Sequence, residues 1–173
     1  MPVSHRNVDA YLRHVIPRYR LGPGARVTQT FDLTFDLSVF DLFATWGSGA
    51  TLVVPSRGEL LSPARFVATR GITHWFSVPS VISVAQRLGR LAGNSMPRLR
   101  WSLFCGEQLT VEQAGAWQRA APGSTVEKPL RPHRTHAQLR TVPAPRRPRR
   151  MAAARPTARC PWASCTPVLR PSS

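Results

Sequence analysis

Apolar residues recur along the first 127 residues at two alternating spacings, one typical of helices and one typical of buried strands. The first helix is expected over about residues 5–19, because Val8, Tyr11, Leu12, Val15 and Ile16 fall on one face and Ser4 can cap its start. Further helices are predicted at 36–49, 62–71, 80–91 and 111–120. Short strands are predicted at 26–31, 50–55, 72–79, 99–106 and 124–127.

Two of the helix starts carry specific signals. Ser62 is expected to cap the helix in which Pro63 takes the first position, and Gly71 ends that helix. Thr110 and Gln113 have the spacing of a capping box.

Strands that alternate with helices of about ten residues predict an α/β fold, with a parallel sheet and helices packed on its faces. Ligands bind such sheets at the carboxyl ends of the strands. The residues in that position are Asp36, the segment 77–80 and the segment 105–108.

The pattern stops after Glu127. Residues 128–173 hold 11 of the 24 basic residues, 9 of the 17 prolines and no acid, whereas residues 1–127 carry a net charge of only +5. The segment has neither helical nor strand periodicity, and its Arg- and Pro-rich composition predicts a disordered basic tail.

Composition places limits on location and on metal binding. No apolar run of about 18 residues appears, which argues against a membrane span, and the polar start does not resemble a targeting signal. The three cysteines, Cys105, Cys160 and Cys165, have no metal-ligand or disulfide-framework spacing. These features favour a cytoplasmic protein without a metal site.

Three carboxylates lie among the aromatic residues of "FDLTFDLSVFDLF". Asp36 falls between a strand and a helix, where it can either cap the helix or face a pocket and bind a ligand ammonium group. Spacing alone favours the cap. Asp32 and Asp41 are expected at the surface or as capping residues.

The segment "LFCGEQLT" follows a predicted strand. Gly106 would let a flat ligand approach the backbone, and Glu107 is either a pocket acid or a solvated loop residue. Cys105 has no cationic sequence neighbour, so a buried, unreactive thiol is expected. The histidines are scattered and are expected to be structural.

Five segments, "PVSHRNV", "FDLSVFDLF", "SGATLVVP", "VPSV" and "LFCGEQLT", occur in an order and spacing that resemble the adenylate-forming (AMP-binding) ligases. The resemblance is greatest to amino-acid adenylation domains of nonribosomal peptide synthetases and to D-alanine–carrier-protein ligases. It covers residues 1–127 and implies a partial adenylation domain, a fragment of the large N-terminal domain of such enzymes.

The resemblance implies an activity that uses ATP and Mg²⁺ to convert an amino acid to an adenylate and then passes it to a carrier-protein thiol. Asp36 would bind the substrate ammonium group, which reverses the preference for a cap. Gly106, Glu107 and Gln108 would form the strip against which adenine packs. The side-chain pocket would be lined by Leu37, Phe40, Ser77, Leu103 and Cys105.

Several family motifs are missing from the sequence as it stands. The phosphate loop that precedes "SHRN" in the family is absent, and Met1 stands where its last valine would be. The Tyr-Gly-Pro-Thr-Glu motif, the later ribose-binding Asp and the C-terminal domain with its catalytic lysine are absent too. The chain is therefore expected to be inactive in adenylation.

Codons for Asn-Leu-Tyr-Gly-Pro-Thr-Glu-Leu-Thr, read one base early, permit "KPLRPHRTH" at all nine positions of residues 128–136. The sequence thus indicates a change of reading frame just after Glu127. Two alternatives stay open. The chain could be a non-catalytic binding fragment, or the tail could be an arm that binds polyanions, at least nonspecifically.

Overall fold

The computed structural model describes residues 4–129, which form a five-stranded parallel sheet with helices on both faces. The strands are β1 (Arg26–Thr28), β2 (Thr51–Val53), β3 (His74–Ser77), β4 (Trp101–Phe104) and β5 (Thr125–Glu127). The helices are α1 (His5–Arg18), η1 (Phe40–Ala44), α2 (Thr45–Gly47), α3 (Arg57–Leu60), α4 (Pro63–Arg70), α5 (Ser80–Arg87) and α6 (Val111–Ala120). The expected α/β architecture is confirmed.

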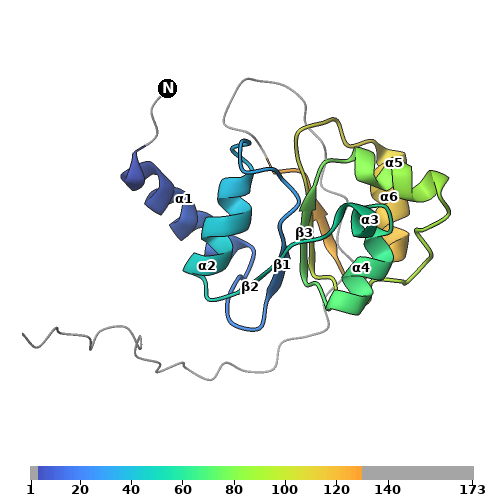
Figure 1. The fold of residues 1–173 in the computed structure, drawn as a ribbon, viewed down its shortest axis with the longest axis horizontal. Coiled ribbons are helices and arrows are strands. Elements are labelled where there is room, and N and C mark those ends of the chain that lie inside the picture. The colour runs from blue at the N-terminus through green and yellow to red at the C-terminus, as the bar shows by residue number, and fades with distance from the viewer. Residues whose placement is uncertain (1–3, 130–173) are drawn as a thin grey trace, which may run out of the picture. The chain divides into compact units, whose positions relative to one another are not determined.

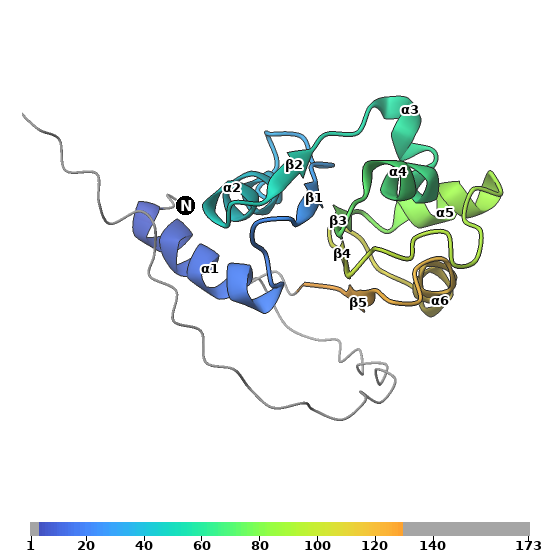
Figure 2. The same ribbon diagram turned by 90° about the horizontal axis from the view of Figure 1, so that it is seen from below.

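The strand order is β2-β1-β3-β4-β5, and every neighbouring pair is parallel. Helices α1 and α2 cover one face of the sheet and α3 to α6 cover the other, as Figure 1 and the view from below in Figure 2 show. Parallel strands are joined by crossover helices that pack on the faces of the sheet. These connections account both for the alternation of strands and helices along the sequence and for the helices on both faces.

Side chains that alternate along the central strands divide the interior into two cores. Trp75 and Phe104 point to the α4–α6 side, where they pack with Trp117 of α6. Phe76 and Leu103 point to the α1 side. Because both faces are buried, β3 and β4 read as continuous apolar runs rather than as alternating ones.

Local capping determines where several helices begin. The capping box of Thr110 and Gln113 starts α6 as expected, and Ser4 caps α1 with Asn7 as its partner. Ser62 precedes α4, but its side chain accepts no capping hydrogen bond, so that expectation is wrong in detail.

Helix α3 was not predicted. Its capping box of Ser56 and Glu59 is present in the sequence, and four helical residues are too few to show a periodicity.

The helix expected at 36–49 begins later, at residue 38, and Phe40–Ala44 within it form a π-helix. A π-helical turn inside a longer helix commonly marks a site where a side chain needs a particular direction. Here the π-helix carries the buried Asp41. The tail predicted from residue 128 lies, from residue 130 onward, outside the described residues.

Candidate functional site

A cavity of about 370 Å³ opens beside the carboxyl ends of β3 and β4, on the face covered by α1. Five of the six predicted substrate-binding residues line it: Asp36, the predicted ammonium partner, and Leu37, Phe40, Leu103 and Cys105 of the predicted side-chain pocket. The other lining residues are Tyr11, His14, Val15, Arg18, Tyr19, Phe76 and Pro129. This cavity, which we call the substrate cavity after the expectation from the sequence, joins residues from α1, from η1 and the turn before it, and from two adjacent strands.

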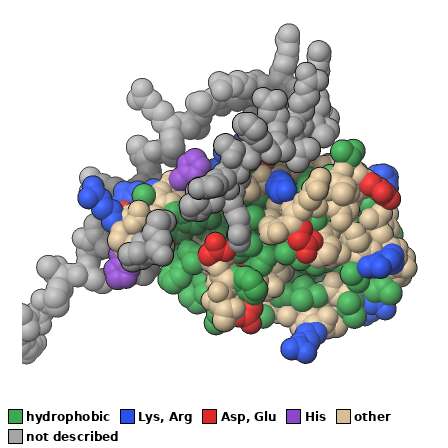
Figure 3. Space-filling view, turned by 90° about the horizontal axis from the view of Figure 1, so that it is seen from above, with side chains coloured by type: hydrophobic (Ala, Val, Ile, Leu, Met, Phe, Trp, Pro, Cys, Tyr) green, Lys and Arg blue, Asp and Glu red, His purple; other side chains and the backbone are tan. Residues whose placement is uncertain are grey.

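Asp36 is exposed and lies in the turn before η1, where its carbonyl oxygen accepts a hydrogen bond from the Val39 amide. Several groups near Tyr11 disfavour ionisation of its phenol. Burial first, and then Tyr19, Asp41, Cys105 and Asp36, raise the pKa of Tyr11 to about 12. The Tyr11 phenol therefore stays protonated, and the cavity offers both a donor and a carboxylate. Figure 3 shows acidic side chains set among apolar ones on the face seen from above.

Helix α1 supplies a wall of the cavity that sequence reasoning did not find. Tyr11, His14 and Arg18 lie three or four residues apart, so they share one helical face. That spacing was visible in the sequence, but nothing local showed that this face meets Leu103 and Cys105 across the sheet.

The cation of this wall is paired within the protein. Arg18 Nη2 donates to Glu127 Oε1 at 2.7 Å, and the Tyr19 hydroxyl donates to the same oxygen at 3.2 Å. The hydrogen bond with Glu127 is the main cause of a raised pKa for Arg18. These contacts tie the end of α1 to β5, the last strand before the sequence pattern changes.

Ser77 does not line the substrate cavity. Its hydroxyl accepts a hydrogen bond from Trp75 Nε1 at 2.8 Å and donates to the Val78 carbonyl, and the residue is buried on the α4–α6 side. Phe76, one residue earlier, reaches the cavity instead. Adjacent strand residues face opposite sides of a sheet, which accounts for the difference.

The loop after β4 contains Gly106, Glu107 and Gln108, and all three are exposed. Gly106 has φ = 93°, and a Cβ there would lie 3.2 Å from Val78 Cγ1. Glu107 accepts hydrogen bonds from the Ser80 amide at 3.0 Å and the Ser80 hydroxyl at 3.2 Å. Glu107 therefore holds the loop against the start of α5, and the glycine leaves the backbone uncovered on one side.

Asp41 differs from its expectation as a surface residue, because it is fully buried. Its Oδ2 atom accepts hydrogen bonds from the amides of Thr30 at 3.2 Å and Phe31 at 3.5 Å. Desolvation outweighs these two bonds and raises the pKa of Asp41 to about 8. Asp32 is exposed, as expected, and accepts hydrogen bonds from the amide and the hydroxyl of Thr34 in the turn that precedes the helix.

The residues present fit a nucleotide base better than its phosphates. The uncovered backbone at Gly106 suits a flat ring. Within residues 4–129 no cluster of three metal-ligating side chains occurs, so Mg²⁺ would depend on phosphate and water ligands here. In the same range, no helix is long and apolar enough to cross a membrane. Cys105 is buried and unbridged.

Comparison with curated proteins gives relatives of one kind. An L-proline–[L-prolyl-carrier protein] ligase of Pseudomonas fluorescens is 34% identical over 113 residues, which are 64% of this chain and 23% of the relative. A D-alanine–D-alanyl carrier protein ligase of Lacticaseibacillus rhamnosus is 31% identical over 127 residues, 72% of this chain and 25% of the relative.

Solved structures agree. IdnL7 is 45% identical with a TM-score of 0.70, covering 72% of this chain and 25% of that one. The Vibrio cholerae adenylation domain AlmE, solved with glycyl-adenosine-5'-phosphate, is 39% identical with a TM-score of 0.66, covering 72% and 24%. The chain thus spans about a quarter of the length of these relatives. Residues 1–128 match the family of AMP-binding enzymes. The chain belongs to the AMP-binding enzyme family.

Proposed function

We propose that residues 1–127 are the amino-acid-recognition part of an ATP-dependent, amino-acid-adenylating ligase of a nonribosomal peptide or other carrier-protein pathway, located in the cytoplasm. The observation that supports this most is the substrate cavity. It brings together five residues that the sequence resemblance assigned to one pocket, although they are separated by up to 69 positions in the chain.

Asp36 is the proposed partner of the substrate ammonium group. Apolar walls formed by Leu37, Phe40 and Leu103 exclude water around the substrate side chain, which strengthens a carboxylate–ammonium pair. Tyr11, which remains protonated, can donate to a polar group of the substrate. Ser77 lies on the other face of the sheet, and it would act only by fixing the Trp75 side chain on that face through their hydrogen bond.

ATP bound with Mg²⁺ would supply the α-phosphate that the amino-acid carboxylate attacks, with pyrophosphate as the leaving group, and the cation would offset the charge that develops. The backbone at Gly106, with Glu107 and Gln108, is the proposed support for adenine. The carrier protein would accept the activated amino acid. The chain contains no Tyr-Gly-Pro-Thr-Glu motif after β5, and we infer that it does not form adenylates by itself.

The frame change after Glu127 is part of this proposal. It rests on the nine permitted positions of residues 128–136 and on the loss of all acidic residues beyond Glu127.

Amino-acid binding is tested by titrating the ¹⁵N-labelled chain with a panel of amino acids and observing backbone amide shifts. Shifts at residues lining the substrate cavity are expected for at least one amino acid. Asp36→Asn should weaken that binding about 10- to 100-fold, because it removes a charge-assisted hydrogen bond. Asp32→Asn is the matched control, since Asp32 is engaged with Thr34. Equal losses in both variants would refute the role of Asp36.

Catalysis is tested by ATP–pyrophosphate exchange with the same amino acids. We expect exchange at the background rate. Amino-acid-dependent exchange in the purified chain would overturn the inference of inactivity.

A second candidate is a folded fragment that binds a ligand or partner without chemistry. Two packed cores within residues 4–129 favour it. Limited proteolysis should then leave a resistant product that ends near Glu127, and rapid complete digestion would exclude it. A polyanion-binding role of residues 128–173 requires a specific, salt-sensitive association that is lost when those residues are removed.

A further inference from the structure

A second cavity, of about 780 Å³, lies at the amino ends of the strands, at the opposite end of the sheet from the substrate cavity. Four arginines line it, Arg26, Arg70, Arg98 and Arg100, and no acidic residue is among its lining residues. We call it the arginine cavity. Several positive charges around one hollow repel one another, and a ligand of negative charge would offset that repulsion.

The register of the sheet places two of these arginines in one row. Val27 pairs with His74 and His74 pairs with Trp101, so the preceding residues Arg26, Thr73 and Arg100 stand side by side. Residues in register on parallel strands direct their side chains to the same face. Two strand spacings separate Arg26 from Arg100, which is a distance of about 10 Å.

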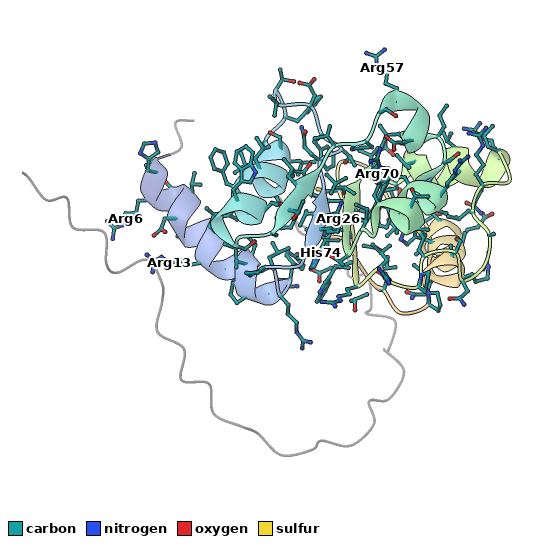
Figure 4. All side chains as sticks on the ribbon, turned by 60° about the horizontal axis from the view of Figure 1, so that its bottom comes forward. Arg6, Arg13, Arg26, Arg57, Arg70 and His74 are labelled. Atoms are coloured by element: carbon teal, nitrogen blue, oxygen red, sulfur yellow. The ribbon has the colours of Figure 1, made fainter. Side chains whose placement is uncertain are left out.

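Hydrogen bonds fix one side of the arginine cavity. Arg26 Nε donates to the Arg70 carbonyl at 2.6 Å, and the Arg26 amide donates to Thr73 Oγ1 at 2.9 Å. The Nη groups of Arg26 make no hydrogen bond within the described residues. Arg70 is held in turn by Glu59, with an Nη2–Oε1 distance of 3.0 Å. Figure 4 shows Arg26 and Arg70 near each other and above His74.

The other side of the arginine cavity carries uncompensated charge. Within residues 4–129, the side chains of Arg98 and Arg100 make neither an ion pair nor a hydrogen bond. His74 adds no charge, because burial above all, and also the Arg100 guanidinium, lower the pKa of its imidazole. Within the part of the chain that the structure describes, three of the four guanidinium groups therefore have no anionic partner.

We propose that the arginine cavity binds a di- or triphosphate group, either as free polyphosphate or as the end of a nucleotide. Planar guanidinium forks match phosphate oxygens in pairs. A ligand with several negative charges can bridge guanidinium groups that extend from strand positions about 10 Å apart, whereas a monovalent anion would leave the repulsion among most of them in place. The four arginines are gathered around one hollow rather than along an extended track, which favours a compact ligand over an extended nucleic-acid strand.

The test is calorimetric titration of the full chain with pyrophosphate, tripolyphosphate and ATP at fixed salt, together with the melting temperature at saturation. Arg98→Gln/Arg100→Gln is the site variant, and it removes no hydrogen bond from the fold. Arg6→Gln/Arg87→Gln removes the same charge from exposed positions outside the arginine cavity. We expect the site variant to bind tripolyphosphate at least tenfold more weakly than the parent, and the control to stay within about twofold.

A rise in melting temperature with tripolyphosphate, present in the parent and the control and absent in the site variant, would support a site built by the fold, since only ligands that favour the folded state stabilise it. Tighter binding of ATP than of tripolyphosphate would identify a nucleotide as the source, and equal binding would identify free polyphosphate. Equal losses in site and control variants would overturn the proposal. Stronger, site-dependent binding of a short single-stranded RNA than of tripolyphosphate would overturn it as well.

Discussion

Asp41 provides a sharp physical test, because a buried carboxyl group makes stability depend on pH. The side chain is completely shielded from solvent within the described residues. Its Oδ2 atom accepts the Thr30 and Phe31 amides, while Oδ1 has no hydrogen-bond partner in residues 4–129. The pKa rises from an ordinary 3.8 to about 8 in the folded protein. Asp41 is therefore neutral in the folded state at pH 7 and ionised in the unfolded chain.

The sign follows from the order of the two pKa values. Below pH 3.8 both states hold the proton, and Asp41 does not change the free energy of unfolding with pH. Between pH 3.8 and pH 8 only the folded state holds it, so stability falls as pH rises, by about 1.4 kcal/mol per pH unit. At pH 7 the accumulated loss is of order 4 kcal/mol.

Asp41→Asn removes this titration while its amide oxygen can still accept the Thr30 and Phe31 amides. We expect the variant to match the parent within about 1 kcal/mol near pH 4 and to exceed its stability by about 2–4 kcal/mol at pH 7. Urea unfolding at half-unit pH intervals from 4 to 8 measures the difference. Asp9→Asn, which removes an exposed pair with Arg13, is the control. It keeps Asp41, so its difference in stability from the parent should not rise with pH as that of Asp41→Asn does. A difference between Asp41→Asn and the parent that stays constant over this range, or falls with pH, would refute the reasoning.

Three other predictions concern packing and pairing. Gly106→Ala should lower the free energy of unfolding by about 1–3 kcal/mol, because Gly106 has a positive φ and an added Cβ would lie 3.2 Å from Val78 Cγ1. Gly24→Ala should cost less, because Gly24 has a positive φ but open space around it. Equal losses in urea unfolding would argue against a role for the contact with Val78. A double-mutant cycle with Arg18→Ala and Glu127→Gln should give a coupling of about 0.5 kcal/mol that declines with salt, because Arg18 is exposed and Glu127 is only partly buried. A coupling that salt does not change would contradict this. Trp117→Phe should lower the free energy of unfolding by about 1–3 kcal/mol, since it leaves the buried Ser102 hydroxyl without its indole donor. Thermal unfolding measures the change, and an unchanged melting temperature would show that this hydrogen bond contributes nothing to stability.

Local signals predicted the elements that local chemistry determines. The capping box at Thr110 and the glycine after α4 placed helix ends correctly, because caps act within one turn. Continuous apolar runs predicted parallel strands, because a strand that is buried on both faces carries apolar residues on both. Strands β3 and β4 are buried in this way. The missed helix α3 had its signal at Ser56 and Glu59, in a segment too short for periodicity.

The features that sequence reasoning missed depend on contacts between distant segments. Asp41 is buried because the loop after β1, ten or eleven residues away in sequence, closes over it. Tyr11 and Arg18 reach the substrate cavity because α1 lies over the sheet face that carries Phe76 and Leu103. No spacing within α1 contains that information. The resemblance brought Asp36 and Cys105 into one pocket only because it carried the topology of a known fold with it.

The central claim is that an amino-acid-adenylating ligase is encoded on both sides of the codon for Glu127, in two reading frames. The nucleotide sequence around that codon tests it most directly. The account predicts that removing one base there opens a long frame that begins with Asn-x-Tyr-Gly-Pro-Thr-Glu. A gene with no such continuation in either alternative frame would contradict it.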